Sequence, residues 1–472
     1  MDMSSGDMSE PTLTTIPNFI KLEQIPVNYI QKVESDLLEP VVFSDGTATT
    51  DGFARFTLQP KGFLHSNSKI FISLVPSATN TNMFLPPQVG IGQVIKKAVL
   101  KVGNKTLNEL DSWGGLHAVK SSLIANEVNA EREIFMTGRW NSTGFAYDDN
   151  VNASGITLET GMEPEVDNDL VELPNWFKHD GSSATKRAEC PSFSIDLSDL
   201  FPFLKVNQLP LYMIDEPVNI ELHFQPQDLY RLQAGTGDAG GVAVNVNRNE
   251  LKFCADYIFY GAGDEMERYR QANQDMSFSF VDYRLIERTI NPTQLTSGII
   301  QNLGMANRVV TRIITVLPPD STANNEISLM GQYQALAPSV FATTGAQAAQ
   351  TRYNVRYNDR FEFTADIDNP SRLMSVFTES EGVPFVTRQA FSNQGTITGG
   401  YTDTFNLDRY GQDEMNGASF FLGTKLTNGR VGQRGIEVHL TSTVSGVDLF
   451  RSYCEYMRVA RLSNGYLDVF NA

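Results

Sequence analysis

Residues 209–226 read LPLYMIDEPVNIELHFQP, and the second half of this stretch alternates between apolar and polar side chains. One face of an extended chain would carry the apolar ones, Val218, Ile220, Leu222 and Phe224. The pattern predicts a β-strand that is buried on one face. GIEVHLTST at residues 435–443 repeats it, with Ile-Glu-Val-His-Leu in place of Ile-Glu-Leu-His-Phe.

Two further pairs of similar segments occur in the same order in the two halves of the chain. FISLVPS at 71–77 resembles IITVLPP at 313–319, and FSID at 193–196 resembles FNLD at 405–408. A weaker pair is formed by the cysteines before ADY and EYM, Cys254 and Cys454. Segments that recur in one order indicate an internal duplication. We therefore expect two homologous domains.

The fold class that follows is all-β, with two tandem jelly-roll β-sandwich domains (a double jelly roll). Short strand-like segments with long connections are typical of antiparallel sandwiches that wrap as Greek keys. A helical and loop insertion is expected in the first domain, from a helical stripe in GLHAVKSSLIANEVNAERE (115–133) and a polar stretch at 141–186. The predicted boundaries are an N-terminal arm, 1–40; a first jelly roll, 41–265; a linker, 266–275; and a second jelly roll, 276–472.

The expected arm is interrupted by prolines but contains many apolar residues. Pro11, Pro17, Pro26 and Pro40 exclude a long helix. The recurring apolar residues favour docking, either on a neighbouring chain or as a strap over the arm's own domain, and the sequence leaves both open.

Composition narrows the classes of function. Of the 472 residues, 41% are hydrophobic and 19% charged, which is typical of folded domains. A net charge of −18 without a basic stripe argues against direct nucleic-acid binding. No window approaches the ~20 apolar residues that span a bilayer, and the N-terminus does not resemble a signal peptide.

The cysteines and the glycosylation sequons fit this interpretation. Three cysteines, the third being Cys190, favour a reducing compartment over a disulfide framework. The sequons at Asn104, Asn141 and Asn152 are therefore expected to be chance matches.

Motifs that carry chemistry are weak. The five histidines are scattered: His65, His117, His179, His223 and His439. GxGxxG at Gly235–Gly240 precedes a strand-like segment rather than a helix and is expected to be a loop. Asp148, Asp149, Asn150 and Asn152 offer oxygen ligands without EF-hand spacing, so calcium stays a minor alternative. No carboxylate pair stands out for glycoside cleavage. We expect no catalytic, cofactor-binding or metal-binding residues, no cofactor and no enzyme.

Two stretches carry a resemblance to a known family. LPLYMIDEPVNIELHF followed by FCADYIFYGAGDEMERY resembles the end of the first jelly roll in double jelly-roll major capsid proteins, particularly those of virophages and polinton-like viruses. GIEVHLTSTVSG with YMRVARLSNGYLDV resembles the end of the second. The lineage includes the adenovirus hexon and the capsid proteins of large DNA viruses. The likeness extends from about Phe53 to the C-terminus.

The resemblance implies a structural protein of a double-stranded DNA virus. Homotrimers would form pseudo-hexagonal capsomers that tile an icosahedral virion capsid, after synthesis in the host cytoplasm, nucleus or viral factory. Partners would be neighbouring capsomers, penton and minor capsid or cement proteins, and an inner membrane contacted through residues 1–40.

Two alternatives remain at this point. The first is a carbohydrate-binding or glycan-hydrolysing β-sandwich protein, which would need surface aromatics; Trp113, Trp140 and Trp176 fall in or near the insertion. The second is a trimeric phage tail or receptor-binding protein, which would not need the duplication.

Overall fold

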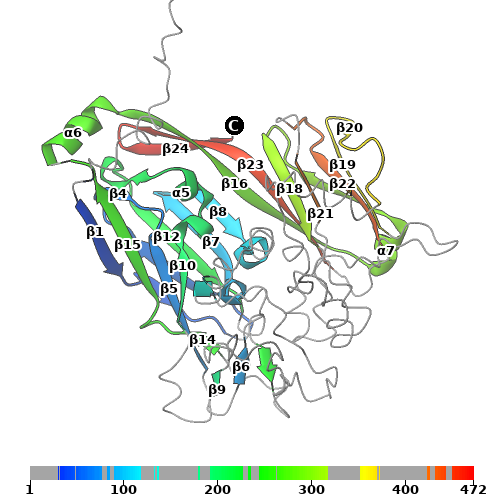
Figure 1. Cartoon of the computed structure of the whole chain (residues 1–472), viewed down its shortest axis with the longest axis horizontal. Helices are drawn as coiled ribbons and strands as arrows, with labels where there is room; N and C mark the ends of the chain where they lie inside the picture. The colour runs from blue at the N-terminus through cyan, green and yellow to red at the C-terminus, as the bar shows by residue number, and fades with distance from the viewer. Residues whose placement is uncertain are drawn as a thin grey trace, which may run out of the picture.

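The chain folds into two repeated β-units that lie side by side (Figure 1). The computed structural model describes residues 30, 32–47, 49–76, 82–84, 90–117, 132, 136–137, 179–180, 192–226, 232–234, 244–261, 263–316, 351–368, 372, 422–425, 431–442 and 449–471.

Eight strands of the first unit alternate between two sheets. In chain order they are β1 (Lys32–Leu38), β3 (Gly52–Thr57), β5 (Lys69–Pro76), β7 (Ile95–Val102), β8 (Lys105–Asp111), β10 (Ser192–Asp196), β12 (Val218–Phe224) and β15 (Lys252–Phe259). One sheet runs β1-β15-β5-β10 and the other β3-β12-β7-β8, with β2 (Val42–Ser44) beside β3. Numbered along the chain, one sheet has the strand order 1-8-3-6 and the other has the order 2-7-4-5. This arrangement of eight strands in two sheets is a jelly roll.

The second unit repeats this order. Its eight strands are β16 (Asp275–Thr289), β17 (Ile299–Gly304), β18 (Val310–Val316), β19 (Thr351–Tyr357), β20 (Arg360–Phe361), β21 (Leu422–Lys425), β22 (Ile436–Ser442) and β23 (Leu449–Ser463). The sheets run β16-β23-β18-β21 and β17-β22-β19-β20. The prediction of two tandem jelly rolls is confirmed.

Smaller elements fill the connections. The short strands are β4 (Phe63–Leu64), β6 (Asn82–Phe84), β9 (His179–Asp180), β11 (Leu209–Pro210), β13 (Leu232–Ala234), β14 (Val244–Val246) and β24 (Tyr466–Asn471). The helices are η2 (Gly90–Gln93), α4 (Leu197–Leu200), α5 (Pro202–Val206), η4 (Leu211–Met213), α6 (Gly263–Ala272) and α7 (Pro292–Ser297). Among the described residues, no helix is long and apolar enough to cross a membrane.

Strands β12 and β22 are the central strands predicted from the repeated line. On β12 the residues Ile220 and Leu222 are fully buried in one hydrophobic cluster. On β22 the equivalent Ile436 and Val438 are buried in a second cluster. Because side chains alternate along a strand, each sequence match fixes which face of the strand turns to the core.

A two-residue hairpin turn, Gly103-Asn104, joins β7 to β8. β7 and β8 pair on both sides of this two-residue turn, from Val102 opposite Lys105. Gly103 has a φ of 57°, and a Cβ there would lie 2.6 Å from Glu216 Oε1. The positive φ therefore favours glycine at this turn.

The register of the sheets shows that two of the proposed repeat pairs were aligned incorrectly. The described parts of FISLVPS and IITVLPP, residues 71–76 and 313–316, fall on equivalent strands, β5 and β18. Ile72 faces its own core, whereas its sequence partner Ile314 faces away from its own core. The alignment is therefore one residue out, which reverses the faces. The cysteine pair fails in the same way, because Cys454 is buried in the second core while Cys254 is half-buried on the outer face of its sheet.

The third pair, FSID with FNLD, stays a prediction. FSID lies in β10, the sixth strand, whose counterpart in the second roll is β21 at Leu422–Lys425. Residues 405–408 lie outside the described residues.

The arm and linker expected from the sequence include regular structure. Residues 32–38 form β1, which pairs antiparallel with β15. This part of the arm lies on the chain's own sheet, as the strap interpretation predicts; residues 1–29 lie outside the described ones. Residues 266–275 include most of α6 and the start of β16.

Within the expected helix at 115–133, residues 115–117 and 132 are helical, and the neighbouring residues 113, 114, 136 and 137 are helical as well. Residues 118–131 lie outside the description. In the polar stretch at 141–186, the described part is β9.

Candidate functional site: the seam between the two jelly rolls

The candidate chemical residues do not converge where the structure describes them. No three His, Cys, Asp or Glu side chains of the described ranges gather in a way that could hold a metal. His65 Nδ1 accepts a hydrogen bond from the Asn67 N–H at 3.0 Å, and His117 stacks on Trp113 at 4.7 Å. His179 is placed through its backbone in β9.

The two histidines of the repeated line have matching environments. His223 packs edge-on against Phe53, and His439 packs edge-on against Phe361, each with ring centroids 5.0 Å apart. Burial, reinforced by the nearby charge of Lys97, lowers the pKa of His223. Both histidines thus contact aromatic rings on their own sheets, which supports the structural interpretation over a catalytic one.

Trp113 is only 1% exposed, and its indole N–H donates to the Asp199 carbonyl at 3.0 Å. A buried indole cannot stack on a sugar, which removes this residue from the carbohydrate-binding hypothesis. The remaining candidates lie outside the described residues: Trp140, Trp176, Cys190, Asn141, the acidic stretch at 148–152 and Gly235–Gly240.

The most elaborate polar arrangement lies where the two jelly rolls meet. Strands β16 and β23 are each 15 residues long and pair along their whole length, from Asp275 opposite Ser463 to Thr289 opposite Leu449. This exceeds the typical strand of about 5–6 residues. Figure 1 shows the pair running from the second roll across the first, above α5 and β8.

The first part of β16 belongs to the core of the first roll. Met276, Phe278 and Phe280 are buried in that cluster. The ring of Phe203 on α5 lies 5.7 Å from Phe278 and 5.1 Å from Phe280, both edge-on. β24 folds back beside β23, and its Leu467 is buried in the same cluster. The second roll therefore supplies part of the first roll's hydrophobic core.

A buried carboxylate, Asp282, lies at the centre of this seam. It pairs with Arg458 at 2.7 Å, and the Asn108 side-chain amide donates to it at 3.1 Å. The Tyr456 hydroxyl and the Tyr283 backbone N–H donate to it at 3.3 and 3.0 Å. Burial raises the pKa of Asp282, and the Arg458 guanidinium opposes that rise.

Arg458 also binds the backbone of the first roll. Its guanidinium donates to the carbonyls of Leu107 and Thr106 on β8 at 3.0 and 3.2 Å. Asn108 accepts from the Phe203 backbone N–H at 2.8 Å, which ties α5 to the same cluster. The polar network thus joins β8 and α5 of the first roll to β16 and β23 of the second.

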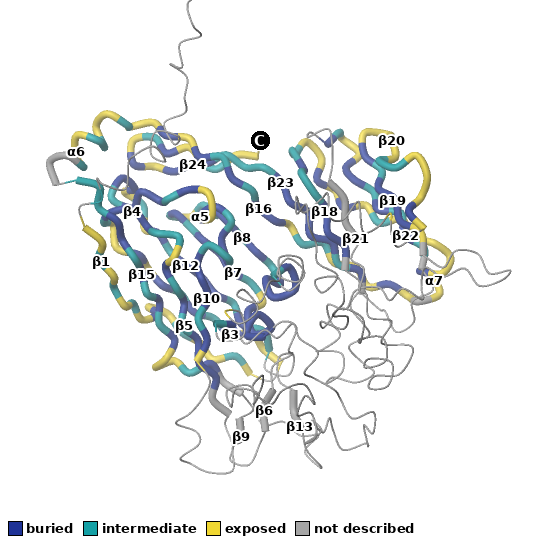
Figure 2. The backbone as a smooth tube through the Cα atoms, in the orientation of Figure 1, coloured by how far each residue is buried: buried dark blue, intermediate teal, exposed yellow. Residues whose placement is uncertain are grey.

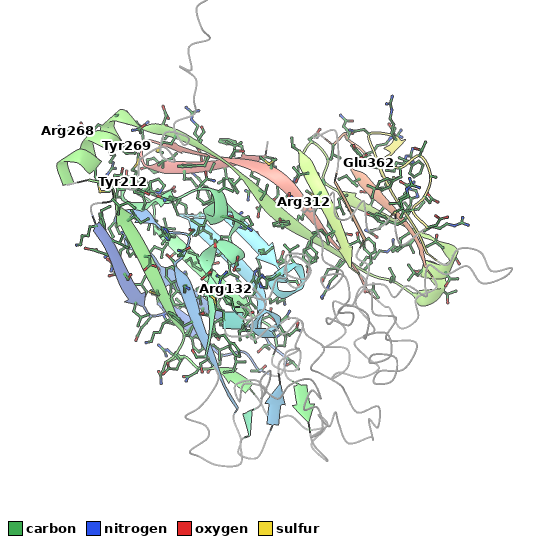
Figure 3. All side chains as sticks on the ribbon, in the orientation of Figure 1. Arg132, Tyr212, Arg268, Tyr269, Arg312 and Glu362 are labelled. Atoms are coloured by element: carbon green, nitrogen blue, oxygen red, sulfur yellow. The ribbon has the colours of Figure 1, made fainter. Side chains whose placement is uncertain are left out.

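A second buried carboxylate, Glu455, lies on the opposite face of β23. It accepts hydrogen bonds from the Tyr283 hydroxyl and from Thr311 Oγ1, the latter at 2.7 Å, and pairs with Arg312 at 2.9 Å. Figure 3 labels Arg312 on β18 beside this strand. Buried carboxylates with a charged partner and several donors hold strands in one arrangement.

The outer face of the second roll's sheet completes the seam. The Tyr453 hydroxyl donates to the Ser112 carbonyl at the end of β8, at 3.1 Å. Tyr283, Ile314 and Tyr453 belong to the first roll's hydrophobic cluster although they lie on second-roll strands. Because a shared core and a polar network both cross the seam, the two rolls form one unit rather than two hinged domains.

Sequence reasoning missed this seam. The length of the stretch DMSFSFVDYRLIERT, which forms β16, was not interpreted in the sequence analysis. That length was the available signal, because a strand of 15 residues is longer than one jelly roll of this size needs.

No protein-family model and no curated protein sequence matches the chain. Solved structures do resemble it. A quasi-atomic model of the PBCV-1 virus capsid matches with a TM-score of 0.53 and 13% identity, covering 93% of this chain and 97% of that one. A cryo-EM structure of the Sputnik virophage matches with a TM-score of 0.52 and 8% identity, covering 94% and 89%. The resemblance to double jelly-roll capsid proteins is thereby confirmed at the level of the fold.

Proposed function

We propose that this chain is a structural major capsid protein, which assembles as pseudo-hexagonal homotrimers that tile an icosahedral virion shell. The observation that carries the proposal is that two jelly rolls with one strand order are fixed to each other by a shared core. The fold likeness to the PBCV-1 capsid and to the Sputnik virophage supports it.

The physical argument is one of symmetry. Three copies of a chain that contains two equivalent units present six similar wedges around one axis. A six-sided outline tiles a flat or gently curved lattice without gaps, provided that the two wedges of a chain keep a constant angle. The buried Asp282 network and the shared aromatic core at the seam would maintain that angle.

The partners that follow are mostly copies of the same chain. Within the trimer and between capsomers the protein would contact itself, and at other places in the shell it would contact penton and minor capsid or cement proteins. Of the expected arm, the residues before β1 would face an inner membrane where one is present. Synthesis would take place in the host cytoplasm, nucleus or viral factory, and the protein would act without catalysis, cofactors or direct nucleic-acid binding.

We keep the domain extents proposed from the sequence, 41–265 and 276–472, with one addition. β1 supplies the first strand of the first roll, and the proposed first unit therefore begins at Lys32.

Light scattering across a dilution series tests the proposal. A mass of about 157 kDa, three times the chain mass of 52.4 kDa, that resists dilution is expected. Electron microscopy of the same sample should show six-sided particles, whereas an elongated trimer would favour a tail or receptor-binding protein. A monomer at all concentrations would contradict the proposal and would direct attention to glycan binding.

A further inference from the structure

The seam between the two rolls joins unlike surfaces. The second roll contributes its first strand, β16, and the first roll contributes its fifth strand, β8. The reverse pair consists of the first strand of the first roll, β1, and the fifth strand of the second, β20. Figures 1 and 2 show these two strands on opposite sides of the molecule, β1 at the left and β20 at the right. Each pairs with one strand among those described, β15 and β19 respectively.

The fifth strands correspond residue by residue through their turns. β8 follows β7 after Gly103-Asn104, and β20 follows β19 after Asn358-Asp359, which have φ values of 51° and 62°. Counting from these turns, Thr106 on β8 corresponds to Phe361 on β20. The carbonyl of Thr106 accepts from Arg458 across the seam. Phe361 therefore occupies the position at which the first roll meets its neighbour.

The first strands correspond through the ladder. In the first roll, the core-facing Ile70 on the third strand pairs with Phe253 on the eighth strand, and Phe253 pairs with Leu38 on the first strand. In the second roll, the core-facing Ile313 pairs with Cys454, and Cys454 pairs with Arg284, in the same order. Leu38 and Arg284 therefore occupy equivalent positions. Leu37 therefore corresponds to Tyr283. Tyr283 is buried in the seam.

The unused surfaces carry apolar side chains that the monomer leaves in water. On β1, Leu37 is 62% and Val33 57% exposed, and on β20, Phe361 is 50% exposed. Val33 and Leu37 lie on the same face of β1, since they are four residues apart on a strand. Grouped exposed apolar residues on an edge strand are typical of an interface.

Most charges of the two surfaces are already paired within the chain. At β1, Lys61 pairs with Glu34 and Asp36, and Lys252 pairs with Glu39. On β19, Arg356 pairs with Glu437 and with Asp359. The proposed contact therefore rests on the apolar side chains and on the correspondence with the seam inside the chain.

We propose that β1 of one chain docks against the β20 edge of a second copy of this chain, in the same manner as β16 docks on β8 within the chain. The inference rests on the proposed trimer and identifies its interface. A contact between two unlike surfaces repeats head to tail and closes into a ring when the rotation permits. In a trimer, three contacts between chains would alternate with the three seams within chains around the axis. The contacts between chains would cover Val33, Leu37 and Phe361.

Single aspartate substitutions test the two surfaces separately. Leu37→Asp removes the apolar side chain of β1, and Phe361→Asp removes that of β20. Val206→Asp is the matched control, because Val206 is 53% exposed at the end of α5, away from both strands. We expect each interface variant to raise the chain concentration at half-association by about 100-fold or more, and the control to leave it unchanged.

A mixture of the two interface variants gives a sharper readout. In a head-to-tail arrangement the Leu37→Asp chain keeps an intact β20 surface and the Phe361→Asp chain keeps an intact β1 surface. The mixture should therefore form dimers of about 105 kDa, two chain masses, and nothing larger, while each variant alone stays monomeric. This complementation also shows that both variants are folded.

The outcomes separate this inference from the proposed function. If the unchanged protein is a trimer and both variants remain trimers with unchanged dilution behaviour, the assignment of the interface is wrong while the trimer stands. If the variants dissociate but their mixture does not form dimers, the head-to-tail pairing is overturned. If the unchanged protein is a monomer at every concentration, the proposed function itself fails.

Discussion

Replacing Arg458 by methionine should destabilise the whole chain, because this residue neutralises a buried carboxylate at the seam. The substitution leaves Asp282 buried without its charged partner, which in general costs about 3–5 kcal/mol. It also removes the donors to the carbonyls of Leu107 and Thr106, each worth about 1.5 kcal/mol or more for a charged donor. Since these effects overlap when one side chain is removed, we expect a loss of about 4–5 kcal/mol in the free energy of unfolding.

The loss should depend on pH in a defined direction. Burial already raises the pKa of Asp282 in the folded chain, so this group binds a proton more readily folded than unfolded. Such a group stabilises the fold more as the pH falls from its folded pKa toward its unfolded one. Without Arg458 the folded pKa rises further, and the deficit of the variant should therefore shrink as the pH is lowered from 7 toward 5.

Urea denaturation of both proteins at several pH values measures this. Asp282→Asn in the Arg458→Met background serves as the control, because a neutral amide in place of the unpaired carboxylate should recover part of the lost stability. A deficit that is constant with pH, together with a double variant less stable than Arg458→Met alone, would refute the argument that the unpaired charge causes the loss.

Three further predictions address the turn, the seam and the cysteines. Gly103→Ala should lower the free energy of unfolding by about 1–2 kcal/mol, since a Cβ at positive φ meets Glu216; thermal melting measures it. Phe280→Ala should cost about 3–5 kcal/mol and should expose the seam to limited proteolysis, because the ring fills the core shared by the two rolls. A thiol reagent at pH 8 should label Cys254 in the folded chain and spare Cys454, whose burial raises its thiol pKa to about 12; equal labelling rates would contradict this.

The parts of the fold that could be predicted are strands whose apolar residues all lie on one face. The lines at 218–224 and 436–440 alternate strictly, so both their strand character and their core faces followed from the sequence. The Gly-Asn dipeptide at 103–104 is a signal of the same kind, because few residues tolerate the backbone geometry of a two-residue hairpin turn.

Pairings that depend on register were harder to predict. IITVLPP contains adjacent apolar residues, Ile313 and Ile314, of which one faces its own core and the other faces the seam. A strand buried on both faces loses the alternation that fixes its register, and the alignment to FISLVPS slipped by one. The seam was unpredictable for a related reason, since Asp282 and Arg458 look like ordinary surface charges until a second unit covers them.

The core shared by the two rolls also affects how the chain can fold during its synthesis. Leu462 on β23 and Leu467 on β24, the last strands of the second roll, are buried in the hydrophobic cluster of the first roll. The first roll therefore cannot complete its core until the last strands of the second roll have been synthesised, although domains generally fold in the order of their synthesis. A prematurely terminated chain would leave Phe203 and its neighbours uncovered, so that unfinished chains would stay unfolded and accessible to proteases rather than enter an assembly.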